Sequence, residues 1–229
     1  MKKILLCLCT LLLIVSLAAC GGGTDQGDTG SGSNQETAEK IEGSGGSVLI
    51  AYFTRAGNIE ETGDVDATTS ASINLRDGKY VGNTELLARW IQEEVGGELS
   101  LIQVAEPYSA DYDQTVERGQ QEKDENARPK LASKVENMES YDTVFLGFPN
   151  WWYDMPMAVY SFLEEYDLSG KTVIPFCTSG GSGFSDTLDT IEDLEPNIKL
   201  MKGLEIPGDD APQSQDSVNE WLRELGFSK

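Results

Sequence analysis

The chain has 229 residues and a formal net charge of −22, with 39 acidic residues, 17 basic residues and no histidine. This surplus of negative charge argues against nucleic acid as a partner. The absence of histidine excludes nucleophile systems that use a Ser–His or Cys–His pair, and metal sites built on imidazole.

Residues 1–20 have the pattern of a secretory signal. Two lysines precede an apolar stretch, residues 4–17, which is too short to span a bilayer as a helix. The stretch ends in Leu17-Ala18-Ala19-Cys20, which resembles the lipobox of bacterial lipoproteins. The resemblance implies export, lipidation of Cys20, and attachment to the outer face of the bacterial cytoplasmic membrane. An ordinary signal with a cysteine near its cleavage site is the alternative.

Residues 21–46 consist mainly of Gly, Ser, Thr, Asp, Gln and Glu. Such a segment cannot bury a core, so it predicts a disordered tether with a reach of roughly 30 Å. The remainder, residues 47–229, fits one α/β domain by size. Because Cys7 and Cys9 would leave with the signal and Cys20 would carry lipid, Cys177 would be the last free thiol, and we expect it to be buried and inert.

Five apolar runs predict the strands of a parallel sheet, and helical patterns lie between them. The strands are predicted at residues 48–53, 99–104, 143–149, 172–177 and 199–206. The helices are predicted at residues 84–95, 111–127, 156–163, 184–194 and 217–225. This alternation predicts an α/β fold with a doubly wound sheet and helices on both faces.

Residues 60–81 interrupt the alternation between the first strand and the first helix. Residues 73–81 alternate around Asp77-Gly78, which is a strong signal for a two-residue hairpin. We therefore predict an inserted hairpin flap at 60–81. The loop before the flap and the helix start after it would then reach the same site from separate parts of the sequence.

Three loops follow predicted strand ends and carry unusual chemistry. Residues 54–58, completed by residues 82–84, offer hydroxyl and amide donors without a nearby lysine, which suits a monophosphate held without a metal. Residues 149–156 place three aromatic side chains in a turn, and residues 178–183 are rich in glycine. Aromatic side chains in a cleft favour a planar ligand. A hydrophobic cap on the sheet edge is the alternative explanation for the tryptophans.

These motifs, in this order at strand ends, resemble the flavodoxin family, in a branch with an insert after the first loop. The resemblance implies a flavodoxin-like three-layer αβα sandwich, with a five-stranded parallel sheet of order 2-1-3-4-5, and noncovalent FMN. By position, it implies that the phosphate is held by Thr54, Arg55, Ala56, Gly57, Asn58, Gly82, Asn83 and Thr84. It implies that the isoalloxazine ring is held by Pro149, Asn150, Trp151, Trp152, Tyr153, Thr178, Ser179, Gly180 and Gly183.

Two positions depart from the family pattern. Ile59 stands where the first loop often ends in a hydroxyl residue, so Thr84 would have to supply that hydroxyl. Tyr153 stands where many relatives have glycine, and a positive φ there costs about 1–3 kcal/mol. The third loop also lacks the ring-stacking tyrosine of many electron-carrying members.

The resemblance implies an FMN-binding lipoprotein that transfers electrons to or from a redox partner protein or a quinone. Because the cofactor carries the chemistry, no side chain is expected to be catalytic, no metal is expected, and the membrane is contacted only through the lipid. An FMN-dependent NAD(P)H:quinone-type reductase is one alternative, although export would separate it from cytosolic nicotinamides. A flavin-binding or scaffolding protein without a redox role is another.

Overall fold

The computed structural model describes residues 47–60, 73–76 and 78–227. The predicted signal, the predicted tether and residues 61–72 of the predicted flap lie outside the described residues, so these interpretations stay predictions. In the described part of the chain, no helix is long and apolar enough to cross a membrane.

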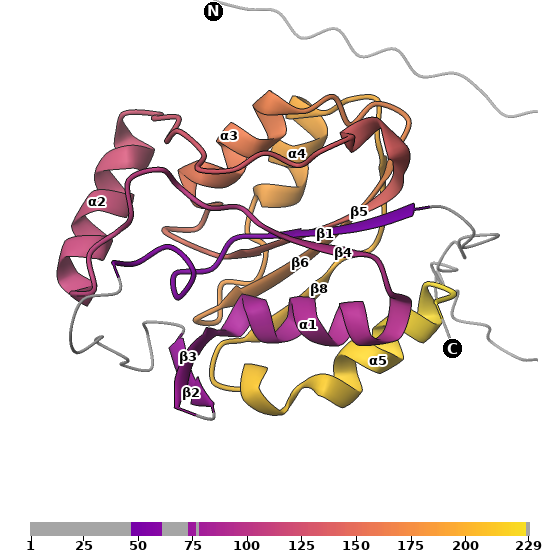
Figure 1. Cartoon of the computed structure of the whole chain (residues 1–229), viewed down its shortest axis with the longest axis horizontal. Helices are drawn as coiled ribbons and strands as arrows, with labels where there is room; N and C mark the ends of the chain where they lie inside the picture. Colours follow the sequence, from indigo (N-terminus) through magenta and orange to yellow (C-terminus); the bar gives the residue numbers. More distant parts are fainter. Residues whose placement is uncertain (1–46, 61–72, 77, 228–229) are drawn as a thin grey trace, which may run out of the picture. The chain divides into compact units, whose positions relative to one another are not determined.

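One parallel sheet forms the middle of the domain (Figure 1). Its main strands are β1 (Ser47–Tyr52), β4 (Glu98–Leu101), β5 (Tyr141–Pro149) and β6 (Thr172–Ser179). They lie in the order β4-β1-β5-β6, and the edge next to β6 is formed by β7 (Lys199–Leu200) and β8 (Leu204–Pro207). The predicted order 2-1-3-4-5 is confirmed.

The fifth predicted strand, residues 199–206, is divided into β7 and β8. Val173 pairs with Leu200, whereas Phe176 pairs with Leu204, so the edge strand holds one residue more than β6 over this interval. Pro175 lies within the interval and has no backbone N–H to donate to the ladder. The extra residue and the missing donor together break the strand.

The helices cover both faces of the sheet (Figure 1). On one face lie α1 (Asn83–Val95) and α5 (Gln215–Glu224), and on the other lie α3 (Met157–Glu165) and α4 (Thr187–Leu194). The acidic helix α2 (Tyr112–Asp124) lies beside the carboxyl ends of the strands, where Asp111 caps its first turn. Short 3₁₀ turns occur at Met138–Ser140 (η2) and Ala211–Gln213 (η3).

Alternation along the strands divides the core into two clusters. On β1, Leu49 and Ala51 face the cluster that includes Phe162 of α3, whereas Ile50 faces the cluster that includes Trp221 of α5. Successive side chains of a strand point to opposite faces, which is why apolar runs without polar interruption form this sheet. Burial of each large apolar side chain stabilises the fold by about 1.5–3 kcal/mol.

A two-stranded hairpin stands between the first loop and α1. It consists of β2 (Ile73–Arg76) and β3 (Lys79–Gly82), and its register pairs Arg76 with Lys79. The Arg76 guanidinium donates to the Pro212 carbonyl at 2.6 Å and lies over the Trp90 ring, 5.9 Å from its centroid. These contacts hold the hairpin against α1 and η3.

Candidate functional site

A cavity of about 310 Å³ opens where the loops after β1, β5 and β6 meet the first half of α2. This volume lies at the lower end of the range of about 300–1,000 Å³ seen for small-molecule sites. The lining residues are Arg55, Tyr112, Thr115, Val116, Asn150, Trp151, Trp152, Thr178, Ser179 and Gly180.

Arg55 is the charged residue of this lining. Its side chain is only 2% exposed, which is rare for an arginine. One Nη donates to the Ala110 carbonyl at 2.9 Å, and the guanidinium carbon lies 5.5 Å from the centroid of the Tyr112 ring. A buried guanidinium at the wall of a cavity favours an anionic group in the ligand.

The start of α1 lies directly against the first loop. A Cβ atom added to Gly82 would stand 1.6 Å from Thr54 Oγ1, so the close approach of the loop and the helix requires glycine at this position. The Thr84 and Thr178 hydroxyls share a hydrogen bond of 2.9 Å, which joins this helix end to the cavity wall at β6. Buried hydroxyls beside a helix N-terminus form a donor set suited to phosphate.

The Asn58 side chain makes its hydrogen bonds within the protein. Its Nδ2 donates to the carbonyls of Thr54 and Ile102, and its Oδ1 accepts the Val104 N–H at 2.8 Å. The side chain is 1% exposed and does not line the cavity. It braces the first loop against the segment that follows β4.

The loop after β5 ends in a tight turn at residues 151–154. The Trp151 and Asp154 backbones exchange hydrogen bonds of 2.8 and 3.0 Å across it. At its tip, Trp152 has φ 57° and Tyr153 has φ 62°, in the left-handed region that favours glycine. The turn therefore holds Tyr153 in the positive-φ conformation that its side chain disfavours, and each such residue costs about 1–3 kcal/mol.

The two tryptophans have different surroundings. The Trp151 ring meets the rings of Phe53 and Tyr108 edge to face, at centroid distances of 5.3 and 5.5 Å. Trp152 is 44% exposed and Tyr153 is 74% exposed. Trp151 thus caps the core as well as lining the cavity, whereas Trp152 lines the cavity from its mouth.

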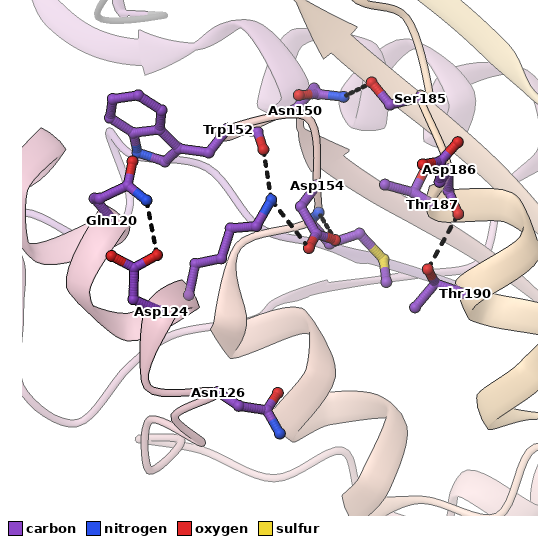
Figure 2. Close-up of polar contacts among 12 residues, drawn as sticks. Gln120, Asp124, Asn126, Asn150, Trp152, Asp154, Ser185, Asp186, Thr187 and Thr190 are labelled. Carbon is purple, nitrogen blue, oxygen red and sulfur yellow. Dashed lines mark hydrogen bonds and ion pairs between the residues drawn. The ribbon is translucent and has the colours of Figure 1, made fainter.

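The glycine-rich third loop is tied to the second. The Asn150 side-chain amide donates to the Gly183 carbonyl at 2.9 Å. It also donates to Ser185 Oγ at 3.1 Å (Figure 2). Ser179 Oγ accepts the N–H groups of Gly181 and Gly183. Both glycines have positive φ, 111° and 57°, so the loop needs residues without a Cβ there. One wall of the cavity is therefore a cross-linked pair of loops.

The structure brings only part of the predicted site into the cavity lining. The predicted residues that line it are Arg55, Asn150, Trp151, Trp152, Thr178, Ser179 and Gly180. The predicted residues outside this lining are Thr54, Ala56, Gly57, Asn58, Gly82, Asn83, Thr84, Pro149, Tyr153 and Gly183. Of these, Thr54, Gly82 and Thr84 form the adjoining helix-end cluster described above.

Three lining residues of α2 were not predicted: Tyr112, Thr115 and Val116. The sequence contains a signal for them, because residues three and four apart share one face of a helix and Tyr112 follows the capping residue Asp111. What the sequence does not reveal is that residues 102–110 carry this helix to the carboxyl edge of the sheet.

Cys177 is fully buried in β6, as predicted. Burial, reinforced by the Glu205 carboxylate, raises the pKa of the thiol to about 12, so it stays protonated and unreactive at neutral pH. The described residues contain no cluster of three or more acidic or thiol side chains that could hold a metal ion.

The strand order and the cavity define the class of protein: an α/β protein with a ligand site where the connections of its sheet reverse direction, between β1 and β5. A family model described as Flavodoxin matches residues 78–225. The chain belongs to the flavodoxin family.

Solved structures and curated relatives agree with this assignment. A candidate flavoprotein from Bacteroides uniformis ATCC 8492 is 31% identical, with a TM-score of 0.58 over 78% of this chain and 99% of that one. A flavoprotein in complex with FMN from Lactobacillus acidophilus NCFM is 17% identical, with a TM-score of 0.52 over 75% of this chain and 99% of that one, and shows the fold alone. Flavodoxin 1 of Escherichia coli (strain K12) is 28% identical over 135 residues, 55% of this chain. That match spans 62% of the length of the relative.

Proposed function

We propose that this domain binds FMN noncovalently at the cavity and serves as an electron carrier. The observation that carries the proposal is the pairing of a buried cation with an aromatic wall. Arg55 supplies positive charge inside the cavity, and Trp151 and Trp152 supply flat apolar surface. A ligand with an anionic end and a planar end matches both features, and a relative of the same fold was solved in complex with FMN.

The residues that would bind FMN form two groups, one for the phosphate and one for the ring system. Thr54, Thr84 and the start of α1 would hold the phosphate together with Arg55, since hydroxyls, a guanidinium and a helix N-terminus all favour an anion. The loops after β5 and β6 would hold the ring system. The cavity of about 310 Å³ and the adjoining helix end thus fit the group.

FMN supplies the redox chemistry when it is bound, and the protein supplies binding and electrostatics. Trp152 lines the cavity and is partly exposed, and the next residue, Tyr153, is exposed, so a partner protein or a quinone would approach there.

The binding proposal is tested by titrating the flavin-free protein with FMN and with riboflavin, following flavin fluorescence. Losing charge-assisted hydrogen bonds of about 1.5–3 kcal/mol each should weaken riboflavin binding at least tenfold. Arg55→Met should remove most of this difference, while Lys134→Ala, at an ion pair outside the cavity lining, should leave it unchanged. Equal affinities of the wild type for the two flavins would contradict the phosphate site.

We also propose that the protein is exported and held at the membrane by lipid on Cys20, with residues 21–46 as the tether. The proposal rests on the small residues before Cys20 and the apolar stretch of residues 4–17. Two acyl chains give stable attachment where one does not. Wild-type protein should incorporate labelled fatty acid and partition with detergent, and Cys20→Ala should do neither. Unlabelled wild-type protein would overturn this part of the proposal and leave FMN binding untouched.

A further inference from the structure

We propose that Lys123 is a positioning residue for the cavity: its ammonium group holds the turn at residues 151–154, the aromatic wall, in its strained conformation. One of its tests, the measurement of FMN affinity, rests on the proposed function. The other test, hydrogen exchange of the turn, does not require that the protein binds FMN.

The turn lacks the residues that stabilise its shape locally. Two-residue turns with positive φ at both central positions strongly prefer Asn-Gly or Asp-Gly, whereas here the central pair is Trp152 and Tyr153. Neither side chain lowers the strain of the left-handed region. Such residues persist only where surrounding contacts fix them, so the contacts of this turn with the rest of the protein decide its conformation.

Lys123 makes those contacts from the last turn of α2. Its Nζ donates to the Trp152 carbonyl at 2.6 Å and lies 3.5 Å from the Asp154 Oδ2. In Figure 2 the dashed lines from Trp152 and Asp154 run to the same amine. The Lys123 ammonium group thus contacts both Trp152, at the tip of the turn, and Asp154, the last residue of the turn. The Lys123 and Asp154 side chains are 34% and 21% exposed, so water screens this pair less than an ion pair at the open surface.

The other side of the turn is fixed to α3. Asp154 Oδ1 accepts the Met155 N–H and the Tyr160 hydroxyl, each at 2.8 Å. Burial, reinforced by the hydrogen bond to Asp154, raises the pKa of Tyr160, which therefore remains a donor to the carboxylate. Asp154 is thereby held in place to receive Lys123, and the turn is fastened between α2 and α3.

The same helix carries both Lys123 and one wall of the cavity. Tyr112 and Val116 line the cavity from α2, and Trp152 lines it from the turn. Lys123 therefore fixes the position of Trp152 relative to the cavity-lining residues of α2. Without it, the Trp152 carbonyl loses its charged donor, and the strained turn can relax into a shape in which Trp152 no longer faces α2.

The test compares Lys123→Ala, Lys123→Arg and the control Lys134→Ala, which removes a lysine–carboxylate pair of 2.5 Å outside the cavity lining. Two quantities are measured: the FMN dissociation constant, and hydrogen exchange of the Asp154 amide in the flavin-free protein. We expect Lys123→Ala to weaken FMN binding about tenfold and to speed exchange by a similar factor. Lys123→Arg should restore most of both, and Lys134→Ala should change neither.

A second variant separates strain from charge. A Tyr153→Gly background relieves the strain at Tyr153 and leaves that at Trp152, so Lys123→Ala should there weaken FMN binding only about threefold. A tenfold loss that persists in this background would show that Lys123 acts on the ligand by charge, which overturns the positioning role. Unchanged exchange in Lys123→Ala would overturn it as well. If wild-type protein binds no FMN, the proposed function fails, while the exchange measurements still decide whether Lys123 holds the turn.

Discussion

Replacing Gly82 with alanine is the most direct test of the join between the first loop and α1. The added Cβ would stand 1.6 Å from Thr54 Oγ1 and 2.8 Å from Thr54 Cβ, well inside the 3.0 Å that Cβ atoms keep from other heavy atoms. Alanine accepts the backbone conformation of Gly82, φ −79° and ψ 152°, so the perturbation is purely steric. Thr54 is 1% exposed and cannot swing into solvent without moving the loop.

Overpacking of this kind should lower the free energy of unfolding by about 1–3 kcal/mol. The phosphate should lose the Thr54 hydroxyl and its alignment with the start of α1. A charge-assisted hydrogen bond of about 1.5–3 kcal/mol corresponds to a fall in FMN affinity of about 10- to 100-fold. Riboflavin has no phosphate, so its affinity should change by less than about threefold.

The assay is a pair of fluorescence titrations on wild-type and Gly82→Ala protein, with urea unfolding as a check on the fold. An equal fall in both affinities would mean that the clash acts on the whole domain instead of the phosphate site. No fall in either would refute the reasoning that Gly82 and Thr54 hold the phosphate together.

Three further predictions follow from the core and the loops. Gly147→Ala would place a Cβ 2.1 Å from Phe176 Cζ, so urea unfolding should show a loss of about 1–3 kcal/mol or more, and an unchanged midpoint would contradict it. Burial, with the Glu85 carboxylate, raises the pKa of Tyr52 to about 12, so stability should fall as pH rises from about 10 through 12, and less so in Tyr52→Phe. Asn150→Ala removes the bonds to the Gly183 carbonyl and to Ser185 Oγ and should speed amide exchange in the third loop, and unchanged exchange would show that Asn150 does not hold that loop.

The strands could be predicted because parallel strands are buried on both faces and read as apolar runs. The division of the edge strand into β7 and β8 could not be predicted, because it depends on a one-residue shift in its pairing with β6 beside Pro175. The hairpin around Gly78 carried its own local turn signal and was therefore accessible from sequence.

The candidate site was only partly accessible. Strand-end chemistry pointed to Arg55 and Trp152, but the side-chain amide of Asn58 gives no sign in the sequence that it braces the backbone. The positive φ of Tyr153 contradicts local preference, because its turn is held by Lys123, thirty positions earlier in the chain. Contacts of this range are set by tertiary packing and leave no periodic pattern.

Strands and helices run in opposite directions in this fold. The first strand therefore begins, and the last helix ends, at the same edge of the sheet. β1 begins and α5 ends at the amino edge of the sheet, on the side opposite α2 (Figure 1). The first half of α2 lines the cavity, so both points lie away from it. β1 alone separates the two edges by roughly 20 Å. A domain immobilised on an electrode or a bead through a linker joined at Ser47 or at Phe227 would therefore keep its cavity open to soluble molecules, which makes both positions suitable attachment points for voltammetry.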